Sequence, residues 1–225
     1  MCYSVSSSLK TTLISLFAII YLLFSKIPYF QWIAILLIGW CGMQFAELLL
    51  WITNPKKCNF WNKIITLTLI PLALMLQPLG SLYGSLYVIS WNKSSSFRKN
   101  FIIFYTFFIV SIVSFSQYHN ITSPCSTITP KGHLNWTTSP YRKYILIDYL
   151  LYFIWGFIIL LPIVLFWKKY FLVILLLLTM PFFAFIYGLY TDGKPSIWCY
   201  YTSYASIASI FLLFLHQTKI YRIIK

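Results

Sequence analysis

Long apolar segments separated by short polar ones dominate the hydrophobic pattern of this chain. A helix needs about 20 apolar residues to cross the hydrocarbon core of a membrane, and seven segments reach or approach that length. They lie near residues 11–24, 31–52, 64–90, 100–115, 144–167, 170–190 and 196–217. The pattern therefore predicts an all-α fold, a polytopic transmembrane helix bundle of about seven spans that forms one domain over residues 1–225. The only long loop, residues 116–143, is too short for a domain of its own.

Two of these segments depart from an ordinary span. The first follows Lys10 and is short, so it could be the core of a signal peptide, which would leave six spans. No small-x-small cleavage site is obvious after it, and we expect it to be retained. The third, at 64–90, would reach about 40 Å as a straight helix against a hydrocarbon core of about 30 Å. We expect Pro71 and Pro78 to kink it.

Composition supports a membrane protein. Apolar residues make up 60% of the chain and charged residues 9%, whereas soluble domains carry about 25% charged residues. The net charge of +14 comes mainly from basic residues between the apolar segments. These form pairs at Lys56–Lys57, Arg98–Lys99, Arg142–Lys143 and Lys168–Lys169. Such clusters are typical of contacts with anionic headgroups, so the expected partner is the lipid bilayer and not nucleic acid.

The long loop carries the signals for orientation, because basic residues divide almost evenly between the two sides. It contains glycosylation sequons at Asn120 and Asn135, although a third sequon, at Asn92, lies on the opposite side. We expect the N-terminus outside and the C-terminus in the cytoplasm. Which membrane the protein occupies stays open.

Four cysteines fall on the same side as the long loop: Cys2, Cys58, Cys125 and Cys199. An oxidising outer face would permit disulfides among them. We expect Cys125 to pair with Cys58 or with Cys199, and four unpaired thiols are the alternative.

Glu47 is the most informative polar residue. An acid in mid-span costs about 2.5–3.5 kcal/mol of insertion free energy, and such residues usually face a bundle interior or cavity. Trp40, Gln44, Glu47 and Trp51 follow i, i+4, i+7, i+11 spacing, which places them on one stripe of a helix. We therefore expect Glu47 to face other helices. There it would either bind a ligand or hold a neighbouring helix by hydrogen bonds.

Further polar and small residues lie on the side of the long loop or deeper in the predicted spans. Asp148 lies one turn into the fifth span, where it could instead cap the helix or pair with Arg142 or Lys143. Gln77 precedes Pro78, and Gly80 and Gly84 follow as a G-x-x-x-G pair that lets helices approach closely. The last span carries a set of small and hydroxyl residues, which we read first as a packing face. We expect Gln44, Glu47, Gln77 and Asp148 to line a pathway or pocket for a small ligand or cation.

The loop and its neighbours offer a second candidate site. His133, Trp136 and Trp198 could form an outer-loop binding site. A zinc site using His119, Cys125 and His133 matches no standard ligand spacing, so we expect no metal and no cofactor.

Several familiar classes of membrane protein are poorly supported. The last span has no lysine before Lys219, which argues against a retinal Schiff base. The chain lacks the Asp-Arg-Tyr and Asn-Pro-x-x-Tyr motifs of G-protein-coupled receptors, and it lacks nucleophile-elbow, His-Glu-x-x-His and phosphate-loop motifs. We therefore do not expect an enzyme.

Short strings along most of the chain carry one resemblance. They are Phe45-Ala46-Glu47 with Trp51, Gln77-Pro78-Leu79, His133 before Trp136, and Ser196-Ile197-Trp198-Cys199. In these strings the chain resembles uncharacterised multi-pass membrane proteins of large DNA viruses and some microbial eukaryotes. The resemblance implies no activity. It implies that Glu47, Gln77, His133, Trp198 and Cys199 form one shared site.

Two hypotheses for function follow, and a third, an intramembrane enzyme acting on lipids, ranks last because the chain offers no convincing nucleophile. The first is a pathway for a small solute or ion, or a ligand pocket, centred on Glu47 and entered from the long-loop side. The second is a structural or assembly protein of a membrane, in which the polar residues serve packing alone.

Overall fold

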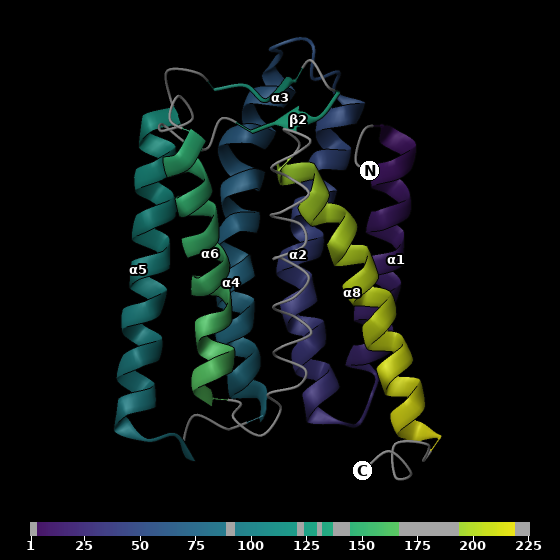
Figure 1. Cartoon of the computed structure of the whole chain (residues 1–225), viewed down its shortest axis with the longest axis vertical. Helices are drawn as coiled ribbons and strands as arrows, with labels where there is room; N and C mark the ends of the chain where they lie inside the picture. Colours follow the sequence, from purple (N-terminus) through teal and green to yellow (C-terminus); the bar gives the residue numbers. More distant parts are fainter. Residues whose placement is uncertain are drawn as a thin grey trace.

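The computed structural model describes residues 4–88, 93–120, 124–129, 132–136, 145–166 and 194–218. Within these ranges the chain is a bundle of long helices with a small hairpin at one end, which we call the hairpin end (Figure 1). The elements are α1 (Val5–Leu23), α2 (Pro28–Ile52), α3 (Phe60–Ile64), the π-helix η1 (Ile65–Leu69), α4 (Ile70–Val88), α5 (Ser96–Asn120), β1 (Thr127–Ile128), β2 (Leu134–Asn135), α6 (Ile145–Phe166) and α8 (Lys194–Gln217).

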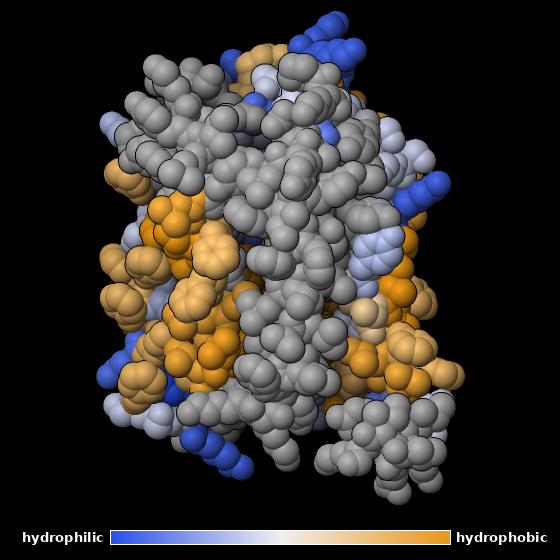
Figure 2. All heavy atoms as spheres, in the orientation of Figure 1, coloured by the Kyte–Doolittle hydropathy of each residue, from blue (hydrophilic) through white to orange (hydrophobic). Residues whose placement is uncertain are grey.

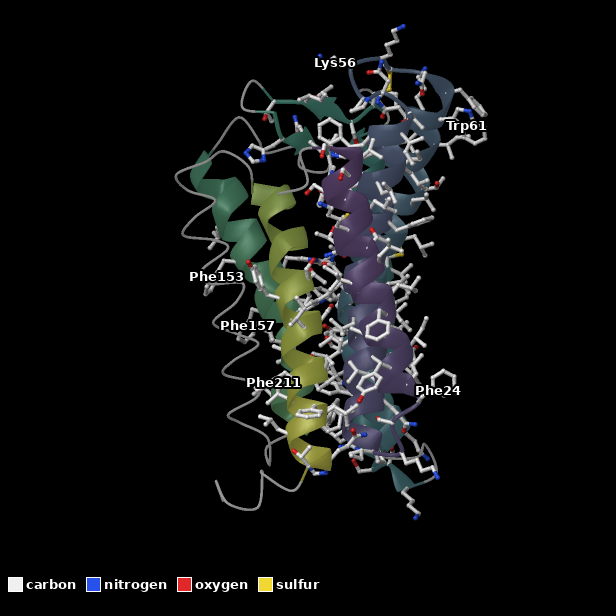
Figure 3. The ribbon with its side chains drawn as sticks, turned by 90° about the vertical axis from the view of Figure 1, so that its right-hand side faces the viewer. Phe24, Lys56, Trp61, Phe153, Phe157 and Phe211 are labelled. Atoms are coloured by element: carbon white, nitrogen blue, oxygen red, sulfur yellow. A yellow bond between two sulfur atoms is a disulfide. The ribbon has the colours of Figure 1, made fainter. Side chains whose placement is uncertain are left out.

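The helices have the length and surface of a membrane protein. Among the described residues, four helical stretches are long and apolar enough to cross a membrane: Val5–Leu23, Pro28–Ile52, Phe60–Gly84 and Ser96–Tyr118. Large apolar side chains lie on the outside, and those of Phe24, Phe153, Phe157 and Phe211 point away from the bundle (Figure 3). In Figure 2 the described residues form an apolar band along the helices, and hydrophilic residues gather mainly toward the two ends.

These four helices account for only part of the seven predicted spans. The helices α6 and α8 coincide with the predicted segments 144–167 and 196–217. The predicted span 170–190 lies outside the described residues. The start of α1 and the hairpin lie at the same end of the bundle, and the end of α8 lies at the other (Figure 1).

The helix α2 is the centre of the bundle, with buried residues around most of its circumference. It packs against α1 and α8 on one side and against α4 on the other, while α4 also contacts α5 and α6. A helix that is apolar all round is expected at such a buried position. Gln44 and Glu47 belong to α2, and both of their side chains are buried in the interior of the bundle.

Close approach of α2 and α4 depends on glycines. A side chain at Gly39 would collide with the Leu76 carbonyl group, and one at Gly84 would collide with the Trp32 ring. The Trp32 indole Nε1–H instead donates to the backbone carbonyl of Ser81, at 3.3 Å. The predicted role of the G-x-x-x-G pair in helix packing is confirmed at Gly84, and Gly39 on the facing helix is a further contact point.

The third predicted segment contains a π-helical turn near Pro71, which was not predicted from the sequence, and Pro78 lies inside α4. The chain runs without a break from α3 through η1 into α4, and η1 ends at Leu69, two residues before Pro71. Proline cannot donate to the carbonyl four residues earlier, and its ring would clash with that carbonyl. Widening one turn to i→i+5 hydrogen bonds accommodates the ring, and the Ile70 N–H accordingly donates to the Ile65 carbonyl.

Helix ends and the loop also differ from the predicted boundaries. The first helix starts at Val5 and not near 11, with Ser4 as its N-cap, and the fourth runs over Ser96–Asn120 and not 100–115. Polar residues at these ends continue the backbone hydrogen bonding beyond the apolar core, so hydropathy underestimates helix length. The fold is mostly helical, as expected, and the predicted loop adds two short strands, β1 and β2, which pair antiparallel.

Candidate functional site

The hairpin is fixed to the start of the continuous helix formed by α3, η1 and α4 by a covalent bond and a buried hydrogen-bond network. Cys58 and Cys125 form a disulfide with their Cα atoms 5.6 Å apart, which is one of the two expected pairings. The Asn62 side-chain amide donates to the Ser126 carbonyl at 3.0 Å and accepts from the Ser126 N–H at 3.0 Å. Thr66, in η1, accepts a second bond from the same N–H at 3.1 Å. All three polar residues are buried, so the hairpin is a rigid cap and not a loose loop.

The second strand of the hairpin, β2, packs against α2 at the hairpin end of the bundle. Leu134 is fully buried and packs in one cluster with Met43, Ala46 and Leu50 of α2. Its neighbour His133 is also buried, and Trp136 packs against the same cluster. The cap therefore lies directly over the end of α2 that carries Glu47.

Below the cap, a hydrogen-bond network joins three helices. The Gln44 amide accepts from the Ser15 hydroxyl of α1 at 3.0 Å and donates to the Ser203 hydroxyl of α8 at 3.4 Å. The Ser206 hydroxyl lies 3.2 Å from the Ser15 hydroxyl and 2.8 Å from the Thr202 carbonyl. We call Ser15, Gln44, Ser203 and Ser206 the Gln44 network. All four are buried, so the network lies within the apolar region of the bundle.

Glu47 lies one turn from Gln44 toward the hairpin end and has 0% exposed surface. Its inward orientation agrees with the stripe predicted from the sequence, of which Trp40 and Gln44 are also buried. Along α2, Glu47 lies nearer to one end than to the middle of the helix. Glu47 is five residues before the end of α2 at Ile52, which is about 8 Å along the helix axis at 1.5 Å per residue. A group there is close to the hairpin end yet shielded from water.

Gln77 belongs to a different part of the interior. Its side-chain carbonyl accepts from the Trp155 indole of α6 at 3.3 Å. A side chain at Gly39 would lie 2.7 Å from the Gln77 backbone nitrogen, so Gln77 is level with Gly39 on α2. Glu47 is eight residues further along α2, or about 12 Å. The structure thus brings Glu47 together with Gln44 and separates both from Gln77.

Several predicted site residues have side chains outside the described residues. The backbone of Asp148 lies in the first turn of α6, and those of Trp198 and Cys199 lie near the start of α8, all without described side chains. Asn120 is the last residue of α5, and its side chain is likewise outside the description. Asn135, on β2, is partly exposed and donates to the Thr127 hydroxyl at 3.4 Å.

Three hydroxyl residues of α1 were not singled out from the sequence. Ser8, Thr12 and Ser15 follow i, i+4, i+7 spacing and are all buried. The spacing was a usable signal, because hydroxyls on one stripe of an apolar helix indicate an inward face.

No protein-family profile, curated protein or solved structure matches the chain. The resemblance to viral and microbial membrane proteins therefore stays a prediction. Among the described residues, no group of three or more histidine, cysteine or acidic side chains could hold a metal ion. The Cys125 sulfur is bonded to Cys58, which removes it from the zinc site considered above.

Proposed function

We propose that this is a seven-span membrane protein in which Glu47 binds a small ligand or cation, or exchanges a proton, from the hairpin side. The observation that carries the proposal is a carboxyl group with 0% exposure near the hairpin end of the central helix, one turn from the Gln44 network. Burying an ionisable group in a membrane interior is costly, and such groups usually mark ligand or ion sites.

The arrangement of the last described helices supports the seventh span. The helix α6 ends at the end of the bundle opposite the hairpin, and α8 begins at the hairpin end (Figure 1). The predicted span 170–190 would connect these two ends.

The disulfide supports an outward-facing hairpin. Disulfides persist in oxidising compartments and are rare in the cytosol. With Cys58–Cys125 outside or in a lumen, the N-terminus lies on that side and the C-terminus in the cytoplasm. The partly exposed Asn135 would then face the enzymes that glycosylate sequons.

A structural or assembly role is the second candidate. It is favoured by the Gln44 network, whose members hydrogen-bond to one another across α1, α2 and α8. Such bonds hold helices together in a membrane without any ligand.

The test is chemical modification of the carboxyl by dicyclohexylcarbodiimide, which enters membranes and reacts with protonated carboxyl groups. The chain has only three acidic side chains, so mass spectrometry of the purified, reconstituted protein can assign each adduct. We expect pH-dependent labelling at Glu47 in the parent, and no labelling at residue 47 in Glu47→Gln. Ser209→Ala is the matched control, because the Ser209 hydroxyl bonds only to the Ala205 carbonyl of its own helix among the described residues.

The result separates the two candidates. Labelling of Glu47 that rises as the pH falls supports an exchangeable carboxyl. A folded protein in which Glu47 resists the reagent at every pH, and in which Glu47→Leu is as stable as the parent, would favour the structural role.

A further inference from the structure

Two hydroxyl groups of α1 are buried beside the Gln44 network. Ser8 is 0% and Thr12 8% exposed, and neither side-chain oxygen has a hydrogen-bond partner among the described residues. Buried hydroxyls in helices commonly donate back to a carbonyl of their own helix. Ser206 and Ser209 of α8 do this, at 2.8 and 2.7 Å. The oxygens of Ser8 and Thr12 are therefore the exception and call for a ligand or a water.

Thr12 and Ser8 lie on the hairpin side of the Gln44 network, as Glu47 does, and the Cys41 thiol of α2 donates to the Thr12 carbonyl at 3.9 Å. The hydrogen bond between Ser15 and Gln44 fixes the register of α1 against α2. The two helices are antiparallel, so moving toward the hairpin end means lower numbers on α1 and higher numbers on α2 (Figure 1). Thr12 and Glu47 are each three residues from this bond, or about 4.5 Å along the axis, and Ser8 follows one turn higher.

We propose that Ser8, Thr12 and Glu47 form a binding site for a hard monovalent cation of the size of Na⁺. This inference rests on the proposed function and names its ligand. Carboxylate and hydroxyl oxygens are ligands that hard cations prefer. One carboxylate balances one positive charge, whereas a divalent ion would leave an uncompensated charge in the apolar interior. Sodium then competes with a proton for Glu47.

The experiment measures protection of Glu47 from dicyclohexylcarbodiimide in the reconstituted full-length protein. Labelling is compared in sodium chloride, potassium chloride, magnesium chloride and choline chloride of equal ionic strength. We expect sodium to protect and choline to leave labelling unchanged. Thr12→Val removes the oxygen at nearly constant volume and should raise the half-protecting sodium concentration about tenfold or more, the equivalent of one lost ligand. Ser8→Ala should act in the same direction, and Ser209→Ala should not.

A second measurement keeps the test decisive if one variant folds poorly. Thermal unfolding is followed by circular dichroism with and without sodium. Sodium should raise the melting temperature of the parent and of Ser209→Ala, and raise it less in Thr12→Val and Ser8→Ala.

Two outcomes would overturn the inference. One is labelling of Glu47 that sodium does not reduce at any concentration. Glu47 would then still exchange a proton, as the proposed function requires, but water and not sodium would fill the site. The other is protection that is unchanged in both hydroxyl variants. Failure of the proposed function looks different, because Glu47 is then unlabelled in choline as well.

Discussion

Single buried side chains set the chemistry of this protein. A polar group inside an apolar bundle is stable only when it has a partner, and leaving one unsatisfied costs about 1–3 kcal/mol. The Gln44 network meets this requirement with bonds to two neighbouring helices. Thr12, on the same face of α1 as Ser15, leaves its oxygen without a bond among the described residues. An apolar substitution should therefore change the stability of the fold in opposite directions at Gln44 and at Thr12.

Gln44→Leu should destabilise the fold. The substitution removes the acceptor of Ser15 and the donor to Ser203, so two buried hydrogen bonds between helices are lost. We expect a loss of about 1–2 kcal/mol in the free energy of unfolding, measured by titrating the micelle-solubilised protein with sodium dodecyl sulfate. Ser209→Ala should change it by much less. Equal stability of Gln44→Leu and the parent would contradict the role given to this network.

Thr12→Val should stabilise the protein in the absence of a cation. Valine has nearly the shape of threonine but no buried oxygen to satisfy, so we expect a gain of about 1 kcal/mol in choline chloride. The same titration measures it. A loss of stability in choline would mean that the Thr12 hydroxyl already has a partner that holds the fold together.

The sequence could predict where Glu47 faces but not what surrounds it. The stripe of Trp40, Gln44 and Glu47 follows from helical periodicity, which is a local property of one segment. Whether Gln77 joins that stripe depends on the register between α2 and α4, which is set by contacts far apart in sequence. That register places Gln77 at the height of Gly39, where Trp155 is its partner.

Among the helices, close packing of α2 against α4 determines how the interior is arranged. The G-x-x-x-G pair is visible in the sequence because its spacing is helical, whereas Gly39 lies alone on the facing helix. Its importance follows only from the nearby backbone of Leu76 and Gln77. The π-helix before Pro71 was likewise not predictable in form, since a proline can be accommodated by a kink or by a wider turn.

Gly39→Ala should therefore separate α2 from α4. Its Cβ would overlap the Leu76 carbonyl, which belongs to the backbone and cannot rotate away. We expect a loss of about 1–3 kcal/mol in the free energy of unfolding. Gly156→Ala, on α6, is the matched control because a Cβ there meets no atom within 4 Å. It should be neutral or stabilising, since alanine favours the helix by about 1 kcal/mol over glycine. Equal effects of the two substitutions would show that the contact tolerates a methyl group.

In the assembled molecule, the hairpin and the helix bundle form one unit whose two ends differ. The hairpin end has a covalently fixed cap above Glu47, while no such cap is described at the opposite end. Hydropathy alone could predict the bundle, because apolar segment length is decided by membrane thickness. It could not predict the cap, since β1 and β2 have two residues each and depend on the disulfide and on Asn62 for their position.

Loss of the disulfide should loosen this cap while leaving the helices in the membrane. Cys58 and Cys125 are separated by 67 residues, and closing a loop of that length stabilises the folded state by at most about 4 kcal/mol in the chain-entropy model. The hydrogen bonds of Asn62 remain in Cys58→Ser/Cys125→Ser, so we expect a smaller loss together with faster labelling of Glu47 by dicyclohexylcarbodiimide. Ser209→Ala is the control, because the Ser209 hydroxyl bonds only within its own helix among the described residues. If the double variant labels at the parent rate, the cap does not control access of the reagent to Glu47.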